Sequence, residues 1–128
     1  MFSRGQPKYY AEEQALLPPL GLLSIAAYVL ENTPHEIHVL DMPAEGLGQA
    51  GLKRHVEDLR PELVGIGCLT NLLYDALETA RSVKCALPSV PVVFGGYHTQ
   101  LYPRETLAHP EVDAIVLGAG EIAFTRLV

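Results

Sequence analysis

The fold is decided by two short apolar runs that end in glycine-bearing turns, LVGIGCL at residues 63–69 and VPVVFGG at residues 90–96. An apolar run of this length between turn residues is typical of a strand that is buried on both faces. Between the two runs, apolar residues recur at helical spacing from Leu73 to Leu87 and stop at Pro88. The order strand, helix, strand predicts parallel pairing, because a crossover helix returns the chain to the starting edge of the sheet.

The same alternation extends toward both ends of the chain. We expect strands at residues 36–40, 63–69, 90–94 and 113–117. We expect helices at residues 20–30, 52–59, 73–87 and from 121 onward, the first of them covered on most of its surface. The pattern predicts one α/β domain over residues 18–128, with a parallel sheet and helices on both faces. Residues 1–17 show no sustained period and are expected to form an N-terminal arm.

Composition limits the class of protein. The chain has 128 residues, of which 48% are apolar, enough for one core. The formal charge of −6 is scattered and no basic run exists, so nucleic acid is not an expected partner. The longest apolar stretch, residues 16–30, contains Pro18-Pro19 and is shorter than the roughly 20 residues that span a membrane. Two cysteines without metal-site spacing favour a reducing, cytoplasmic setting.

The candidate site follows from a rule of open α/β sheets, in which ligands bind outside the carboxyl ends of the strands. Glycines at three of the expected strand ends leave bare backbone, which allows a broad flat ligand to approach the sheet. The competing interpretation is that these glycines only end strands and turn corners. The candidate cofactor-binding residues are Asp41, Gly67, Cys68, Leu69, Thr70, Gly95, Gly96, Tyr97, His98, Gly118, Gly120 and Glu121.

Several of these residues have two interpretations. His98 could face a bound metal, although a loop histidine with a solvent or backbone partner is preferred. Cys68 is expected to pack as a small apolar residue. Glu121 either bonds a ligand or is favoured by the dipole of its helix, and Asp41 either bonds a ligand or caps the loop that follows. The sequence leaves the last two choices open.

The sequence lacks the residues that nucleotide-binding, catalytic and metal sites require. No glycine-rich fingerprint joins a first strand to a helix, and no phosphate-loop lysine is present. No nucleophile and base are suitably spaced, and no Cys/His cluster indicates a metal site. The chain is therefore not expected to be a catalyst by itself, and we assign no catalytic or metal-ligating residue.

An ordered set of motifs carries a family resemblance. The segments are PPLGLLSIAAY at 18–28, HEIHVLD at 35–41, VGI at 64–66, VVFGGYH at 92–98, YPRETL at 102–107 and GAGE at 118–121. In this order they resemble the N-terminal cobalamin-binding domain of cobalamin-dependent radical-SAM enzymes, over residues 16–128. The resemblance implies a flavodoxin-like (Rossmann-like) fold. It also implies a corrin ring over the carboxyl ends of the strands and a nucleotide tail between sheet and helices.

The sequence departs from the cobalamin motifs at two positions. Pro43 stands where the motif Asp-x-His-x-x-Gly would place a cobalt-ligating histidine after Asp41. The resemblance therefore implies base-off cobalamin with no protein histidine on cobalt. Gly67 stands where cobalamin-dependent methionine synthases carry the serine of a Ser-x-Leu element, so one hydroxyl donor is lost.

The resemblance also bears on what lies outside the domain. Relatives carry a further strand, ending in Asn-Pro-Pro, before the Pro-Pro-Leu-Gly segment, and residues 1–17 contain no such strand. A missing first strand would leave an exposed sheet edge, so we expect self-association or residues 1–17 in the vacant position. The chain is expected to end before a radical-SAM barrel, which would hold the SAM and the [4Fe-4S] cluster.

The resulting functional hypothesis is a cobalamin-binding module that presents the corrinoid for methyl transfer or ring-forming chemistry. The resemblance does not choose between reactions like those of anaerobic magnesium-protoporphyrin ester cyclases and the methylation of carbon or phosphorus. The alternative hypothesis is a docking or structural domain that keeps the fold without binding cobalamin.

Overall fold

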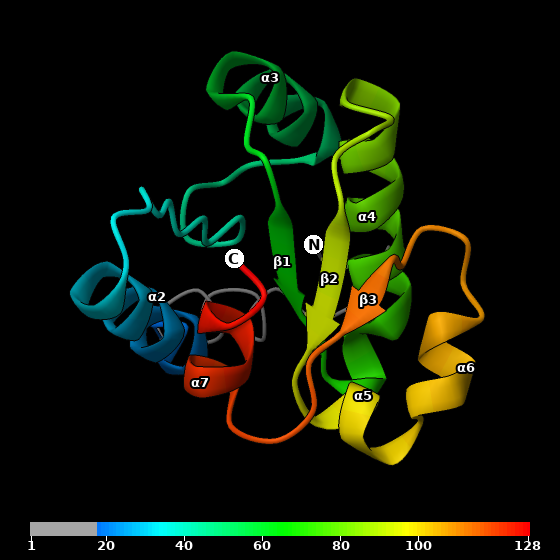
Figure 1. Cartoon of the computed structure of the whole chain (residues 1–128). Helices are drawn as coiled ribbons and strands as arrows, with labels where there is room; N and C mark the ends of the chain where they lie inside the picture. The colour runs from blue at the N-terminus through cyan, green and yellow to red at the C-terminus, as the bar shows by residue number, and fades with distance from the viewer. Residues whose placement is uncertain (1–17) are drawn as a thin grey trace.

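A computed structural model describes residues 18–128, which form an open parallel sheet between helices (Figure 1). The strands are β1 (Val64–Gly67), β2 (Val92–Gly95) and β3 (Ala114–Ile115), in the order β1-β2-β3. Both pairings are parallel. In the register of β1 and β2, Gly67 lies beside Gly95, so the glycines that end the two strands meet at one edge. The predicted fold class is confirmed.

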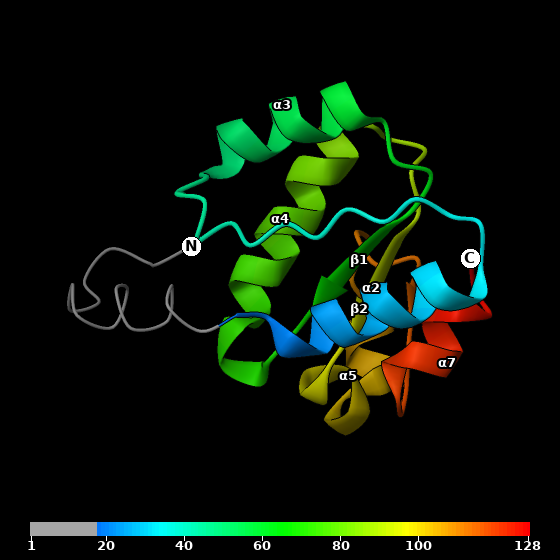
Figure 2. The ribbon, with the colours of Figure 1, turned by 90° about the vertical axis from the view of Figure 1, so that its left-hand side faces the viewer.

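The helices form two layers. On one face of the sheet α3 and α4 pack together, and on the other α2 packs against α7 (Figures 1 and 2). Along the chain, the short helices α5 and α6 lie between β2 and β3, and η1 lies between β1 and α4. The bounds are α2 (Leu20–Asn32), α3 (Gln49–Leu59), η1 (Thr70–Leu72), α4 (Leu73–Ala86), α5 (Tyr97–Leu101), α6 (Pro103–Leu107) and α7 (Gly120–Thr125).

The main core lies between the sheet and the α3–α4 layer. The three apolar residues of β2, Val92–Phe94, are at most 3% exposed, as expected for a central strand. From α4, Leu77, Ala80 and Val83 pack against this strand, and α3 adds Leu52 and Val56. The helical spacing of these residues in the sequence is what brings them to one face.

The segment 36–40 is not a strand, which corrects the sequence prediction. It runs as extended chain, with Ile37, Val39 and Leu40 half-buried. Alternation and β-branched residues favour an extended backbone, but a strand also needs a neighbour to pair with. In the part of the chain that the structure describes, β1 pairs only with β2. The expectation that residues 1–17 occupy the vacant position lies outside the described residues.

The helix α2 is less covered than its composition predicted. Only Ala26 and Val29 are buried, whereas Leu20 is 71% exposed and Leu30 is 56% exposed. An apolar composition indicates what a helix could bury, but the small sheet and the short α7 cover only one side of it. Of the helices between residues 18 and 128, none has the length and apolar character needed to cross a membrane.

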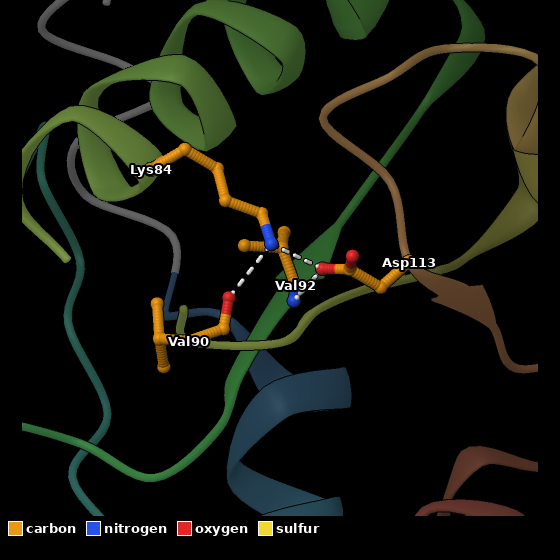
Figure 3. Close-up of polar contacts among 4 residues, drawn as sticks. All are labelled: Lys84, Val90, Val92 and Asp113. Carbon is orange, nitrogen blue, oxygen red and sulfur yellow. Dashed lines mark hydrogen bonds and ion pairs between the residues drawn. The ribbon is translucent and has the colours of Figure 1, made fainter. Parts of the chain in front are cut away.

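A charged cluster holds the amino-terminal end of the sheet together (Figure 3). The Asp113 carboxylate, just before β3, accepts hydrogen bonds from Lys84 Nζ at 2.6 Å and from the Val92 amide at 2.7 Å. Lys84 Nζ also donates to the Val90 carbonyl at 2.8 Å. The Lys84 hydrogen bond, followed by that of Val92, holds the pKa of Asp113 below its ordinary value. One side chain from α4 thus ties together the starts of β2 and β3.

We predict that D113N lowers the free energy of unfolding by about 1 kcal/mol at pH 7, a modest value because both charged side chains are partly exposed. Because the pKa is lowered in the folded state, this stabilisation is present above the ordinary carboxyl pKa. It is lost as the pH falls through the lowered value. Urea unfolding should show the difference between wild type and D113N shrinking below about pH 4. A pH-independent difference, or an equal one for the exposed control D58N, would contradict the assignment.

Candidate functional site

The carboxyl ends of β1 and β2 are joined by backbone contacts. The Cys68 amide donates to the Gly95 carbonyl at 2.8 Å, and the His98 amide donates to the Cys68 carbonyl at 3.2 Å. The loop after β1 and the start of α5 are therefore in direct contact. The structure brings together Gly67, Cys68, Gly95, Gly96 and His98, all predicted from the sequence as site residues.

Gly96 makes this contact possible. Its φ of +99° is rarely adopted by other residues, and a Cβ at this position would lie 2.6 Å from the Cys68 carbonyl oxygen. Thr99 supports the turn, because its buried hydroxyl donates to the Gly96 carbonyl at 2.7 Å. The fold itself therefore requires glycine at position 96, independently of any ligand.

Gly67 and Gly95 differ from Gly96 in this respect. A Cβ on Gly67 would have Leu22 Cδ2 as its nearest neighbour, at 3.8 Å, and a Cβ on Gly95 would have Val116 Cβ at 4.0 Å. Both are ordinary van der Waals distances, so the described residues leave room for a side chain at either position. The two adjacent strands therefore end in bare backbone that the packing among the described residues does not require. This arrangement suits a broad ligand that must approach the sheet edge closely.

The loop after β3 is tied to its neighbours by small contacts. The carbonyl of Gly118 accepts from Gln100 Nε2 of α5 at 3.4 Å. Gly120 lets α7 approach α2, because a Cβ there would lie 2.5 Å from Ile25 Cδ1. Glu121 accepts a hydrogen bond from the Ser24 hydroxyl of α2 at 2.7 Å, and this bond lowers the pKa of its carboxyl. The Glu121 carboxylate therefore bridges the two helices of this layer.

His98 is placed differently from the sequence expectation. It lies in α5 and is only 5% exposed, and its Nδ1 is 3.3 Å from the Thr70 hydroxyl. Its ring also lies against Tyr102, with centroids 5.2 Å apart. The preferred interpretation, a loop histidine with a solvent or backbone partner, is wrong on both points. The side chain holds Thr70 and the β1 loop against α5.

Cys68 belongs to the core, as the sequence predicted. It is 1% exposed, and burial raises the pKa of its thiol to about 11, so the thiol stays protonated at neutral pH. Around it, Leu69 is 46% exposed and Tyr97 is 74% exposed. These two side chains supply exposed apolar surface beside the glycine-ended strands.

The contacts of Asp41 are with the turn that follows it in the sequence. Its carboxylate accepts from the Ala44 amide at 3.3 Å, and its carbonyl accepts from the Glu45 amide at 2.9 Å. It therefore caps the turn that follows the extended segment, one of the two roles left open by the sequence. Among residues 18–128, no three His, Cys, Asp or Glu side chains are grouped so as to hold a metal ion.

Sequence reasoning missed three residues in this region. Thr99 supports the Gly96 turn, Ser24 bonds Glu121, and Phe124 lies against Gly65 of β1. A threonine three residues after a glycine is a weak signal for Thr99, whereas the other two depend on how α2 and α7 meet. A hollow at the opposite edge, lined in part by Arg60, Leu87 and Val90, contains none of the predicted site residues.

Comparisons with known proteins identify the family of this domain. The family model for the B12 binding domain matches residues 10–128. The chain belongs to the B12-binding domain family. Within this family, the glycine-ended edge of β1 and β2 is the region that the sequence resemblance assigned to the corrinoid.

Relatives of this B12-binding domain are larger enzymes. An uncharacterized methyltransferase of Pyrococcus horikoshii is 37% identical over 112 residues, which are 87% of this chain and 24% of the relative. An anaerobic magnesium-protoporphyrin IX monomethyl ester cyclase of Rubrivivax gelatinosus is 29% identical over 95% of this chain and 23% of the relative. A cobalamin-dependent radical SAM methyltransferase of Streptomyces tokunonensis is 32% identical over 55% of this chain and 10% of the relative.

The chain spans about a quarter of the length of the first two relatives. No solved structure gives a significant match to it. The resemblance to cobalamin-binding domains of radical-SAM enzymes is thus confirmed at the level of the domain family and of related enzymes.

The glycines of the site should separate into two classes by stability. G96A should lower the free energy of unfolding by more than about 2 kcal/mol, because it adds backbone strain and a clash with Cys68. G67A and G95A should each stay within about 1 kcal/mol of wild type, because their Cβ atoms have room. Urea unfolding of the three variants measures this, and equal losses would refute the distinction.

Proposed function

We propose that this B12-binding domain holds cobalamin against the carboxyl edge of β1 and β2 and presents it to a radical-SAM domain. The family match and the names of the related enzymes support the corrinoid as ligand. The observation that carries the proposal is the bare backbone at Gly67 and Gly95, for which the packing of residues 18–128 gives no reason. A corrin ring is broad and flat, and side chains at these positions would hold it away from the sheet.

The residues around the edge have distinct parts in this proposal. Gly67 and Gly95 would form the surface on which the corrin ring lies. Leu69 and Tyr97 would provide apolar surface beside the ring. Thr70, His98 and Thr99 hold the two loops in place through their hydrogen bonds. Bound cobalamin would supply the cobalt centre for methyl transfer or for ring-forming chemistry.

We further propose that the cofactor is bound base-off without a protein histidine on cobalt. Pro43 occupies the position at which a ligating histidine would follow Asp41. His98, the histidine nearest to the glycine-ended strands in sequence, is buried against Thr70 and Tyr102. Gly67 has no hydroxyl, so its contact with the ligand would be van der Waals only.

We also propose what kind of larger protein contains this domain. The related enzymes are about four times as long as the matched region. We propose that a radical-SAM barrel carrying SAM and a [4Fe-4S] cluster follows residue 128, in a cytoplasmic protein. The corrinoid and this barrel, rather than nucleic acid or a membrane, would be its partners.

The alternative is a docking module that keeps the fold without cobalamin. The exposed apolar residues of α2, Leu20 and Leu30 among them, favour this alternative, because an apolar helix face suits a protein partner. The two functions differ in whether a corrinoid is retained by the chain.

Retention of hydroxocobalamin tests the proposal directly. The purified 128-residue chain is mixed with hydroxocobalamin and desalted, and its visible spectrum is recorded. Wild type should keep the corrin absorbance, and G67V and G95L should lose it, because each side chain would occupy volume needed by the ring. S89L, at the other end of β2, is the matched control and should retain the cofactor. Loss of absorbance in wild type would favour the docking module.

Self-association through the open edge of β1 is a separate proposal. Within residues 18–128, β2 is the only strand paired with β1, so the backbone groups on its other edge can accept a strand from a second copy. Sedimentation velocity at several concentrations should show a larger species that dissociates on dilution. A monomer at every concentration would refute this.

A further inference from the structure

The strand β1 presents two glycines toward the α2–α7 layer. Val64 and Ile66 pack against the core on the α4 side, so the alternation of the strand directs Gly65 and Gly67 the other way. The nearest side chains to their missing Cβ atoms confirm the direction, since Phe124 comes from α7 and Leu22 from α2. We call Gly65 and Gly67 together the glycine face. Both residues are exposed, although they lie in a sheet strand.

Phe124 partly covers the glycine face. A Cβ on Gly65 would lie 3.2 Å from Phe124 Cε2 and 3.4 Å from Phe124 Cζ, so the ring rests almost directly on the Gly65 backbone. Phe124 is only half-buried, so part of its side chain meets solvent. A flat group can lie on Gly65 only after this ring has moved.

The backbone that carries Phe124 is held in place. α7 packs against α2 (Figure 2), with Gly120 close to Ile25 and Glu121 bonded to Ser24. Phe124 follows this attachment within one helical turn. Movement of the ring therefore means rotation about its side-chain bonds and not displacement of the helix.

We propose that Phe124 is a gate on the glycine face that discriminates between corrinoids with and without a nucleotide tail. This inference rests on the proposed function. The glycine face continues from the carboxyl edge at Gly67, so a flat appended group of an edge-bound corrinoid reaches it along β1. Such a group must displace the ring, whereas a corrinoid that lacks it leaves Phe124 where it is.

A tailed corrinoid can bind only while the gate is open. Its apparent affinity is therefore the affinity for the open form multiplied by the fraction of molecules that are open. A minor conformer of this kind is populated at about 10% or less. Removing the ring in F124A should therefore tighten hydroxocobalamin binding by about tenfold or more. Binding of diaquacobinamide, which has no nucleotide tail, should stay within about twofold. F124W, with a larger ring over Gly65, should weaken hydroxocobalamin binding alone.

Dissociation constants of both corrinoids, measured by absorbance titration of the 128-residue chain, test the gate. I122A changes an exposed apolar residue of the same helix and should leave both constants unchanged. F124L keeps more apolar volume and should change hydroxocobalamin binding in the same direction as F124A, which guards against a folding defect in F124A. Far-UV circular dichroism confirms that each variant is folded.

The outcomes separate the gate from the proposed function. A selective gain for hydroxocobalamin supports the gate. Weaker hydroxocobalamin binding in folded F124A or F124L, or an equal change for both corrinoids, overturns the gate and leaves cobalamin binding intact. If wild type binds neither corrinoid, the proposed function fails and the gate fails with it.

Discussion

The approach of Gly96 to Cys68 is the constraint on which the rest of the site depends. The Cys68 backbone accepts from the start of α5 and donates to the end of β2, so the loops after β1 and β2 are joined at one residue. Only a residue without a Cβ fits the space beside the Cys68 carbonyl at a φ of +99°. This contact fixes the position of α5, because α5 begins directly after Gly96. His98 and Thr99 lie in the first turn of α5 and are positioned with it. Without it, the glycine-ended strands would not share a defined edge.

The two ends of the sheet are held together by different chemistry. At the amino-terminal end, Lys84 and Asp113 bind the strand starts with charged side chains. At the carboxyl end, backbone hydrogen bonds and buried small side chains join the strands, and Gly67 and Gly95 carry no side chain. The carboxyl edge is thereby connected without being filled. The proposed corrinoid site at this edge would therefore need no rearrangement of the strands.

Much of the fold could be predicted because its central elements have strong local signals. The apolar run of β2 and the helical spacing of α4 each indicate one structure, and both are confirmed. Residues 36–40 show the limit, because their alternation is local whereas a strand needs a neighbour that the sequence does not specify. The exposure of α2 could not be predicted for a similar reason, since it depends on how little α7 covers.

The arrangement of the candidate site could be predicted more in its position than in its detail. Glycines after successive strands predicted that residues such as Gly67 and Gly95 would meet at one edge, because parallel strands all end on the same side of a sheet. The sequence did not separate Gly96, which the fold requires as glycine, from Gly67 and Gly95, where the described neighbours leave room for a side chain. This difference depends on distances to Cys68, Leu22 and Val116. The burial of His98 and the bond between Ser24 and Glu121 are likewise products of packing between distant segments.

The central claim is that a corrinoid binds at the carboxyl edge of β1 and β2. The most direct test is a series of ¹⁵N–¹H correlation spectra of the chain during titration with diamagnetic hydroxocobalamin. The account predicts shifted or broadened amide signals for Gly67, Leu69 and Gly95, and unchanged signals for Ser89 and Asp113 at the opposite edge. A spectrum that does not change at saturating hydroxocobalamin, or one whose changes centre on Ser89 and Asp113, would contradict it.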